Sequence, residues 1–136
     1  MSMIKFDDSM VVNIKTIDEQ HKGLIDDINK LTTAMKSAKG QDILNDIFAD
    51  LLAYADYHFE TEEELFKKYN YPDGDKHIEE HNSFRDRVEE FNSKYQQQNK
   101  LGITVEILNF FADWLRNHIK KTDKAYAKFF NDLGVY

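Results

Sequence analysis

The sequence contains no cysteine. This absence excludes disulfide bonds, iron–sulfur clusters and zinc sites built on thiolates. If the protein binds a metal ion through its side chains, the ligands must therefore be histidine, aspartate or glutamate. The sequence has five histidines and 25 acidic residues, so their positions carry most of the information about a metal site.

Helix-breaking residues are also scarce, with one proline and five glycines among 136 residues. They separate four long segments in which apolar residues recur every three or four positions, which is the period of an amphipathic helix. A capping-box pattern, Thr16 followed by Glu19, predicts the start of the first helix. The other three segments run from about Gln41 to Lys68, onward from Pro72-Asp73-Gly74, and from about Thr104.

Four helices of this length joined by short turns pack most simply as an antiparallel bundle. We therefore predict an all-α fold with up-down-up-down topology and a single domain over residues 1–136. An N-terminal arm (1–16) precedes the four-helix bundle (17–122), and a C-terminal segment with a short helix follows (123–136).

Basic residues are outnumbered by acidic ones, 18 to 25, and the formal net charge is -7. An acidic surface repels nucleic-acid phosphates and anionic lipids, so we expect neither nucleic acid nor a membrane as a partner. No segment approaches the length of a membrane span, and acids replace the apolar core of a signal peptide at the N-terminus. These features predict a cytoplasmic protein.

All five histidines lie on the apolar side of a predicted helix. His21 is near the start of the first helix and His58 near the end of the second; His77 and His81 are near the start of the third, and His118 near the end of the fourth. In an antiparallel bundle these helix ends lie at the same end of the molecule. One such histidine is more often a hydrogen-bonded core residue than a ligand, but five at one level predict a metal site.

Spacing within the helices supports this site. His77 and His81 are four positions apart, so both imidazoles leave one helix face and can reach one ion. His58 and Glu62 have the same spacing, and a carboxylate can bridge two ions because it has two oxygens. The neighbouring Glu60, Glu63 and Glu64 leave that face and are interpreted as solvated charges.

Asp123 is the carboxylate that spacing places least well. It follows His118 by five residues, which at about 100° per residue puts it off the face of the histidine in a regular helix. Either the backbone departs from regular geometry, for instance by a π-type bulge, or Asp123 reaches in from the side. A third interpretation is an ordinary surface acid.

Together these motifs resemble those of the hemerythrin family, and the bacterial single-domain members most closely. The motifs are IDEQHKGL at 17–24, HFETEEELF at 58–66, the two histidines after Tyr-Pro, and WLRNHIKKTD at 114–123. The resemblance covers nearly the whole chain and fills all seven ligand positions of the family. The chain departs from the usual pattern at Phe6 and Phe66, neither of which is a ligand.

The resemblance implies a centre of two iron ions (Fe²⁺/Fe³⁺) with a bridging oxo or hydroxo group and two bridging carboxylates. One iron would take the three histidines of the third and fourth helices. The other would take the two histidines of the first and second helices and keep an open position. The implied metal ligands are His21, His58, Glu62, His77, His81, His118 and Asp123.

The implied function is reversible binding of molecular oxygen for transport, storage or delivery, which is not an enzyme activity. Reversibility requires a pocket that offers no proton to the bound oxygen. The residues expected to line it are apolar, although they also suit an ordinary bundle core: Leu24, Ile25, Phe59, Trp114, Leu115 and Ile119.

Two other function classes remain open. In an oxygen or redox sensor, the state of the iron would alter contact with a signalling protein, whereas a carrier would hand oxygen to an unidentified receiving protein. A di-iron enzyme acting on peroxide or nitric oxide would need a proton source and electron delivery. Tyr126 is the one phenol near the predicted site in sequence, but we expect it to pack against the end of the bundle.

Overall fold

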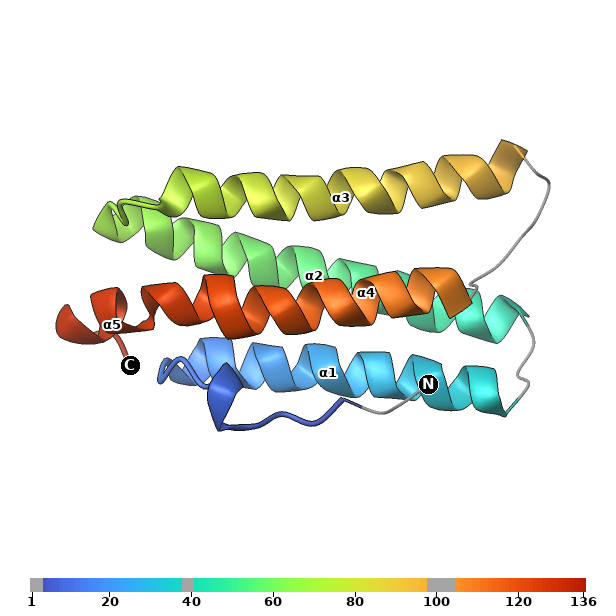
Figure 1. The fold of residues 1–136 in the computed structure, drawn as a ribbon, viewed down its shortest axis with the longest axis horizontal. Helices are drawn as coiled ribbons and strands as arrows, with labels where there is room; N and C mark the ends of the chain where they lie inside the picture. The colour runs from blue at the N-terminus through green and yellow to red at the C-terminus, as the bar shows by residue number, and fades with distance from the viewer. Residues whose placement is uncertain (1–3, 38–40, 98–104) are drawn as a thin grey trace.

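The chain forms a bundle of four long helices. The computed structural model describes residues 4–37, 41–97 and 105–136, which contain no strand. The long helices run alternately up and down (Figure 1), so the all-α antiparallel bundle with an N-terminal arm and a short C-terminal helix is confirmed. Thr104, the predicted start of the fourth helix, lies outside the described residues. The elements are η1 (Asp8–Met10), α1 (Lys15–Lys36), α2 (Gln41–Tyr69), α3 (Gly74–Gln97), α4 (Val105–Asn117), η2 (His118–Asp123) and α5 (Lys124–Asp132). No helix among these residues is both long and apolar enough to cross a membrane.

The start of α1 differs from the capping-box prediction. The helix begins at Lys15, so Thr16 already lies within it, and the cap position, Ile14, has extended backbone with no side-chain cap hydrogen bond. The carboxylate of Asp18 instead accepts a hydrogen bond from the N–H of Val12 at 2.9 Å. The capping box is therefore wrong, because the first turn is anchored to the preceding arm rather than closed by Thr16.

The N-terminal arm lies along α1 (Figure 1) and is held by side chains of the bundle. The amide of Asn29 bonds to both backbone groups of Ile4, accepting from its N–H at 2.9 Å and donating to its carbonyl at 2.8 Å. At the other end of the arm, the ammonium group of Lys124 donates to the carbonyl of Val11. The arm is thus fixed to α1 and to α5.

A polar layer that contains the five histidines, Glu62 and Asp123 divides the apolar core into two clusters. The interior cluster fills most of the bundle, while an end cluster closes the end where α1 and α3 begin. Along α1, Ile17 belongs to the end cluster and Leu24 to the interior cluster, with His21 buried between them. On α2, Glu62 likewise lies between Phe59 of the interior cluster and Phe66 of the end cluster. From α4 to α5, His118 and Asp123 lie between Leu115 and Tyr126 in the same way. The end cluster comprises Val12, Ile14, Ile17, Phe66, Tyr126 and Phe130.

Candidate metal centre

All seven predicted ligand residues lie together in this polar layer. None of the seven is more than 2% exposed. Every histidine directs its Nε2 atom toward a carboxylate oxygen of Glu62 or Asp123, which lie at the centre of the layer. The closest separations are 2.9 Å for His21, 3.0 Å for His58, 2.8 Å for His77, 3.4 Å for His81 and 3.0 Å for His118.

A turn of π-helix brings Asp123 into the layer. Element η2 is a π-helix that spans His118 to Asp123 between two α-helical stretches. Because a π-turn closes over five residues instead of four, a residue five positions on returns to the same face. The first of the two proposed geometries is therefore confirmed. Asp123 is fully buried, so it is not a surface acid.

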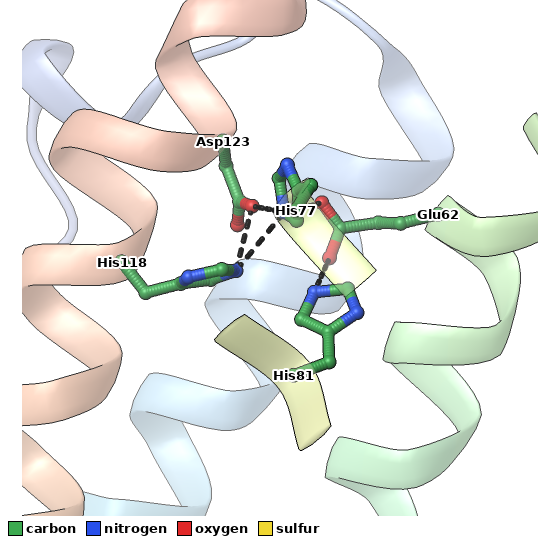
Figure 2. A group of neighbouring side chains, drawn as sticks. All are labelled: Glu62, His77, His81, His118 and Asp123. Atoms are coloured by element: carbon green, nitrogen blue, oxygen red, sulfur yellow. Dashed lines mark hydrogen bonds and ion pairs between the residues drawn. The ribbon is translucent and has the colours of Figure 1, made fainter. Parts of the chain in front are cut away.

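The seven side chains form two groups that share both carboxylates. In each group, one candidate ligand atom from every residue lies within 4.8 Å of all the others. Asp123 directs Oδ1 toward His77 and His118 and Oδ2 toward His21, which is the arrangement of a bridging carboxylate. The three-histidine group, all of which is drawn in Figure 2, is Glu62, His77, His81, His118 and Asp123; the two-histidine group is His21, His58, Glu62 and Asp123.

Most of the close nitrogen–oxygen pairs in the layer lack hydrogen-bond geometry. Among the described residues, no hydrogen-bond partner is found for the buried Nε2 atoms of His21, His58 and His81 or for the four buried carboxylate oxygens of Glu62 and Asp123. Buried polar groups in proteins nearly always have one. Two ligand atoms that each lie about 2.1 Å from one ion, at roughly right angles, are about 3 Å apart, close to the separations found here. The residues therefore fit metal ions better than a hydrogen-bond network.

The two carboxylates govern protonation in the metal-free layer. Burial, the largest single effect, lowers the pKa of His58, but the charges and hydrogen-bonding oxygens of Glu62 and Asp123 together outweigh it and raise this pKa to about 9. For His118 burial is likewise the largest single effect, and Asp123, Glu80 and Glu62 together outweigh it, so the pKa rises to about 10. Burial and the Asp123 charge oppose ionisation of Glu62, yet the facing histidines lower its pKa to about 2. At neutral pH the metal-free layer thus holds ionised carboxylates and protonated imidazoles on His58 and His118, whose protons a metal ion would replace.

Three polar residues that the sequence did not assign to the site contact the outer nitrogens of histidines. Glu63, interpreted above as a solvated charge, lies 2.8 Å from Nδ1 of His81 and is only 19% exposed, so that interpretation is wrong. Gln20 and Glu80 make comparable contacts on other histidines. Helical spacing does not predict these three residues as part of the site, because each is next to a predicted ligand in the sequence and therefore lies on a different face of the helix.

Aromatic rings pack against the imidazoles of the three-histidine group. Phe59 stacks on His81 with ring centroids 4.0 Å apart, and Trp114 stacks on His118 at 4.5 Å. Such contacts fix the ring planes of the candidate ligands.

Tyr126, expected at the end of the bundle, does lie in the end cluster. Its buried hydroxyl has no hydrogen-bond partner in residues 4–37, 41–97 and 105–136, and burial raises its pKa well above the usual value.

The residues predicted to line an oxygen pocket lie in the interior cluster or against it. Leu24, Ile25, Phe59, Leu115 and Ile119 are buried there, and Trp114 packs on the cluster from a half-buried position. Trp114 also borders an open groove between α3 and α4. Their role as a pocket lining stays a prediction.

A four-helix bundle with histidine and carboxylate ligands on its facing helices is a non-haem metal-binding bundle. Residues 12–130 match the family described as the hemerythrin HHE cation binding domain. The chain belongs to the hemerythrin family.

Relatives and a solved structure agree with this assignment. The chain is 31% identical over 127 residues to a bacteriohemerythrin of Stenotrophomonas maltophilia, covering 93% of this chain and 81% of the relative. It is 31% identical to a bacteriohemerythrin of Clostridium acetobutylicum, over 91% of this chain and 98% of the relative. A crystal structure of wild-type hemerythrin has a TM-score of 0.81 and 27% identity, covering 93% of this chain and 97% of that one.

Proposed function

We propose that this chain binds molecular oxygen reversibly at a centre of two iron ions, for oxygen transport, storage or delivery. The observation that carries the proposal is the inequality of the two ligand groups, which contain five and four residues and share Glu62 and Asp123. If both ions have the same coordination number, the two-histidine group leaves one more position for a small external ligand. The names of the relatives, bacteriohemerythrin and hemerythrin, support the same function.

The ligand set suits iron among the redox-active metals, because imidazole and carboxylate donors both bind it well. Two ferrous ions would supply the electrons that oxygen takes up on binding and returns on release. Glu62 and Asp123 would each contribute to holding both ions, and an oxo or hydroxo group derived from solvent would complete the centre. The residues that would hold one ion are His77, His81 and His118; those that would hold the other are His21 and His58; Glu62 and Asp123 would serve both ions.

The chain's own contribution to reversibility is to exclude water and proton donors. Six apolar residues of the interior cluster or packed against it would line the oxygen pocket: Leu24, Ile25, Phe59, Trp114, Leu115 and Ile119. None of them has an acidic group that could protonate bound oxygen. Tyr126 stacks on His77, in the three-histidine group, and its raised pKa keeps the proton on the phenol. These features favour a carrier over an enzyme that consumes oxygen or peroxide.

Optical spectra of anaerobically reduced, iron-loaded protein test the proposal. Spectra are recorded before oxygen is added, after it is added, and after it is removed under vacuum. We expect a nearly colourless reduced protein to gain a visible absorption band with oxygen and to lose it under vacuum, over several cycles. A permanent ferric spectrum after the first exposure would contradict oxygen carriage and favour a redox sensor or a di-iron enzyme.

A further inference from the structure

Two histidines of the three-histidine group have carboxylates on their outer nitrogens. Nδ1 of His81 lies 2.8 Å from Oε2 of Glu63, and Nδ1 of His118 lies 3.3 Å from Oε1 of Glu80. An ionised carboxylate can only accept a hydrogen bond, so both Nδ1 atoms are donors. The Nε2 atoms of these histidines are then free to face a metal ion.

Both carboxylates are held in place by a second contact. The guanidinium of Arg85 donates to Oε2 of Glu63 at 3.3 Å and lies over the ring of Phe59, 5.2 Å from its centroid. The hydroxyl of Thr122, within the π-turn, donates to Glu80 at 2.9 Å. Both carboxylates are therefore held beside their histidines, Glu63 at 19% exposure and Glu80 at 43%.

Within the part of the chain that the structure describes, the two-histidine group has no such anion on its outer nitrogens. Nδ1 of His58 lies 2.7 Å from Oε1 of Gln20, which is a neutral amide. The amide nitrogen of Gln20 donates to the hydroxyl of Thr61 at 3.2 Å, and that hydroxyl donates to the carbonyl of Tyr57. These two hydrogen bonds fix which end of the Gln20 amide faces His58. Nδ1 of His21 is buried without a hydrogen-bond partner.

We propose that Glu63 and Glu80 are positioning residues that make the three-histidine group the tighter metal-binding position, while the neutral Gln20 leaves the two-histidine group weaker. A carboxylate that accepts from Nδ1 draws the proton away and increases electron density at Nε2, which strengthens the bond of the imidazole to a cation. A neutral amide does this less, because charge-assisted hydrogen bonds are about twice as strong. The inference rests on the proposed two-metal site and adds an order of filling to it.

The difference between the outer contacts of the two groups also affects how easily an ion in each group is oxidised. A more strongly donating imidazole stabilises the higher oxidation state of a metal ion. An ion in the three-histidine group would therefore be easier to oxidise than its neighbour, independently of the external ligand. Charge on Glu63 and Glu80, and not only the number of histidines, would set this inequality.

Titration of the metal-free protein with Co²⁺ tests the proposal, because its visible absorption reports the ligand set of each bound ion. The wild-type protein should bind two Co²⁺ per chain in two steps. Glu63→Gln and Glu80→Gln keep the size and remove the charge, and each should weaken the first step about 10- to 100-fold and leave the second unchanged. Glu64→Gln removes the same charge from the adjacent, exposed position and should change neither step.

Gln20→Glu tests the inference from the opposite side. It adds a carboxylate next to His58 and should tighten the second Co²⁺ step while leaving the first unchanged. In the iron-loaded protein, Glu63→Gln should also raise the midpoint potential of one iron, which a loss of folding alone would not do selectively.

The outcomes separate the two levels of the proposal. A wild-type protein that binds fewer than two Co²⁺ per chain would overturn the two-metal site itself. Two-step binding that Glu63→Gln, Glu80→Gln and Gln20→Glu leave unchanged, or that the first two variants weaken equally in both steps, would overturn the role of Glu63 and Glu80 alone.

Discussion

Glu62 lies in a position that is unfavourable for a carboxylate without nearby cations. Its carboxylate is fully buried, faces His58 and His81, and has two oxygens without a hydrogen-bond partner. An unpaired buried charge is costly for folding. The residue therefore makes physical sense only together with cations, either the protonated imidazoles of the metal-free protein or metal ions.

Replacing Glu62 or His77 with alanine should abolish the binding of two metal ions per chain. Glu62 belongs to both ligand groups, and His77 lies between the two carboxylates, 2.8 Å from Asp123 and 3.7 Å from Glu62. Stability should also fall, since metal binding is coupled to folding. Metal analysis of reconstituted protein checks this, with exposed Glu64→Ala as control. If both variants bind two irons normally, the ligand assignment is wrong.

At Gly23 a neighbouring residue leaves no room for a side chain. A Cβ atom added there would lie 2.6 Å from the hydroxyl oxygen and 2.9 Å from Cζ of Tyr54. Alanine favours a helix by about 1 kcal/mol over glycine, but overpacking costs about 1–3 kcal/mol. Gly23→Ala should therefore lower the free energy of unfolding by about 1 kcal/mol in urea titrations. The double variant with Tyr54→Ala should lose less than the sum of the single variants; strict additivity would show that this contact is not the cause.

At the scale of the helices, the sequence predicts what depends on period and misses what depends on tertiary contacts. The bundle and the common level of the histidines follow from apolar spacing, because few arrangements bury four amphipathic faces. The start of α1 does not, since it depends on the contact between Asp18 and Val12. The role of Glu63 was missed for the same reason, because only the packing of α2 against α3 brings it to His81.

Asp123 shows how one irregular turn limits prediction. Regular helix geometry cannot place it on the face of His118, and no apolar period marks the π-turn that does. The alternatives for its geometry could be written down from the sequence, and only the structure distinguishes them.

Changing the length of this turn should test its purpose. Deleting the exposed Lys121 places the aspartate four positions after His118, where a regular α-helix already puts both side chains on one face. The deletion variant should therefore still bind two metal ions. Inserting an alanine after Lys121 adds about 100° of rotation and should abolish binding of at least one ion. Metal stoichiometry and circular dichroism decide the matter; loss of metal in the deletion variant with retention in the insertion variant would contradict this account.

For the molecule as a whole, the polar layer makes folding and metal binding one problem. The layer lies between the interior cluster and the end cluster, so the two clusters can be buried together only if the charges of the layer are compensated. Ions that bind only the folded chain would stabilise it by about 2.7 kcal/mol at a concentration 100 times the dissociation constant. In the metal-free protein, the protons on His58 and His118 partly replace that charge.

Metal affinity should consequently rise with pH. His58 and His118, with pKa values of about 9 and about 10 in the metal-free protein, are protonated at pH 7, and an imidazole must lose its proton to bind a metal ion. One such histidine lies in each ligand group, so the affinity for each Zn²⁺ should increase about tenfold per pH unit between pH 7 and 8. Competition with a chelator measures this rise, and a dye in weakly buffered solution should detect about two protons released per chain on loading.

The stability of the metal-free protein should change with pH in the opposite direction. Both folded-state pKa values lie above the unfolded value of about 6.5, so their stabilising contribution is complete below that pH and is lost as pH rises through about 9 and about 10. Urea titrations of metal-free protein at pH 6 and pH 10 check the sign, and His118→Gln should flatten the dependence. The Zn²⁺ experiment tests the same two protons. A Zn²⁺ affinity that is constant between pH 7 and 8 would mean that His58 and His118 are already neutral in the metal-free protein, so that the carboxylates do not keep these imidazoles protonated.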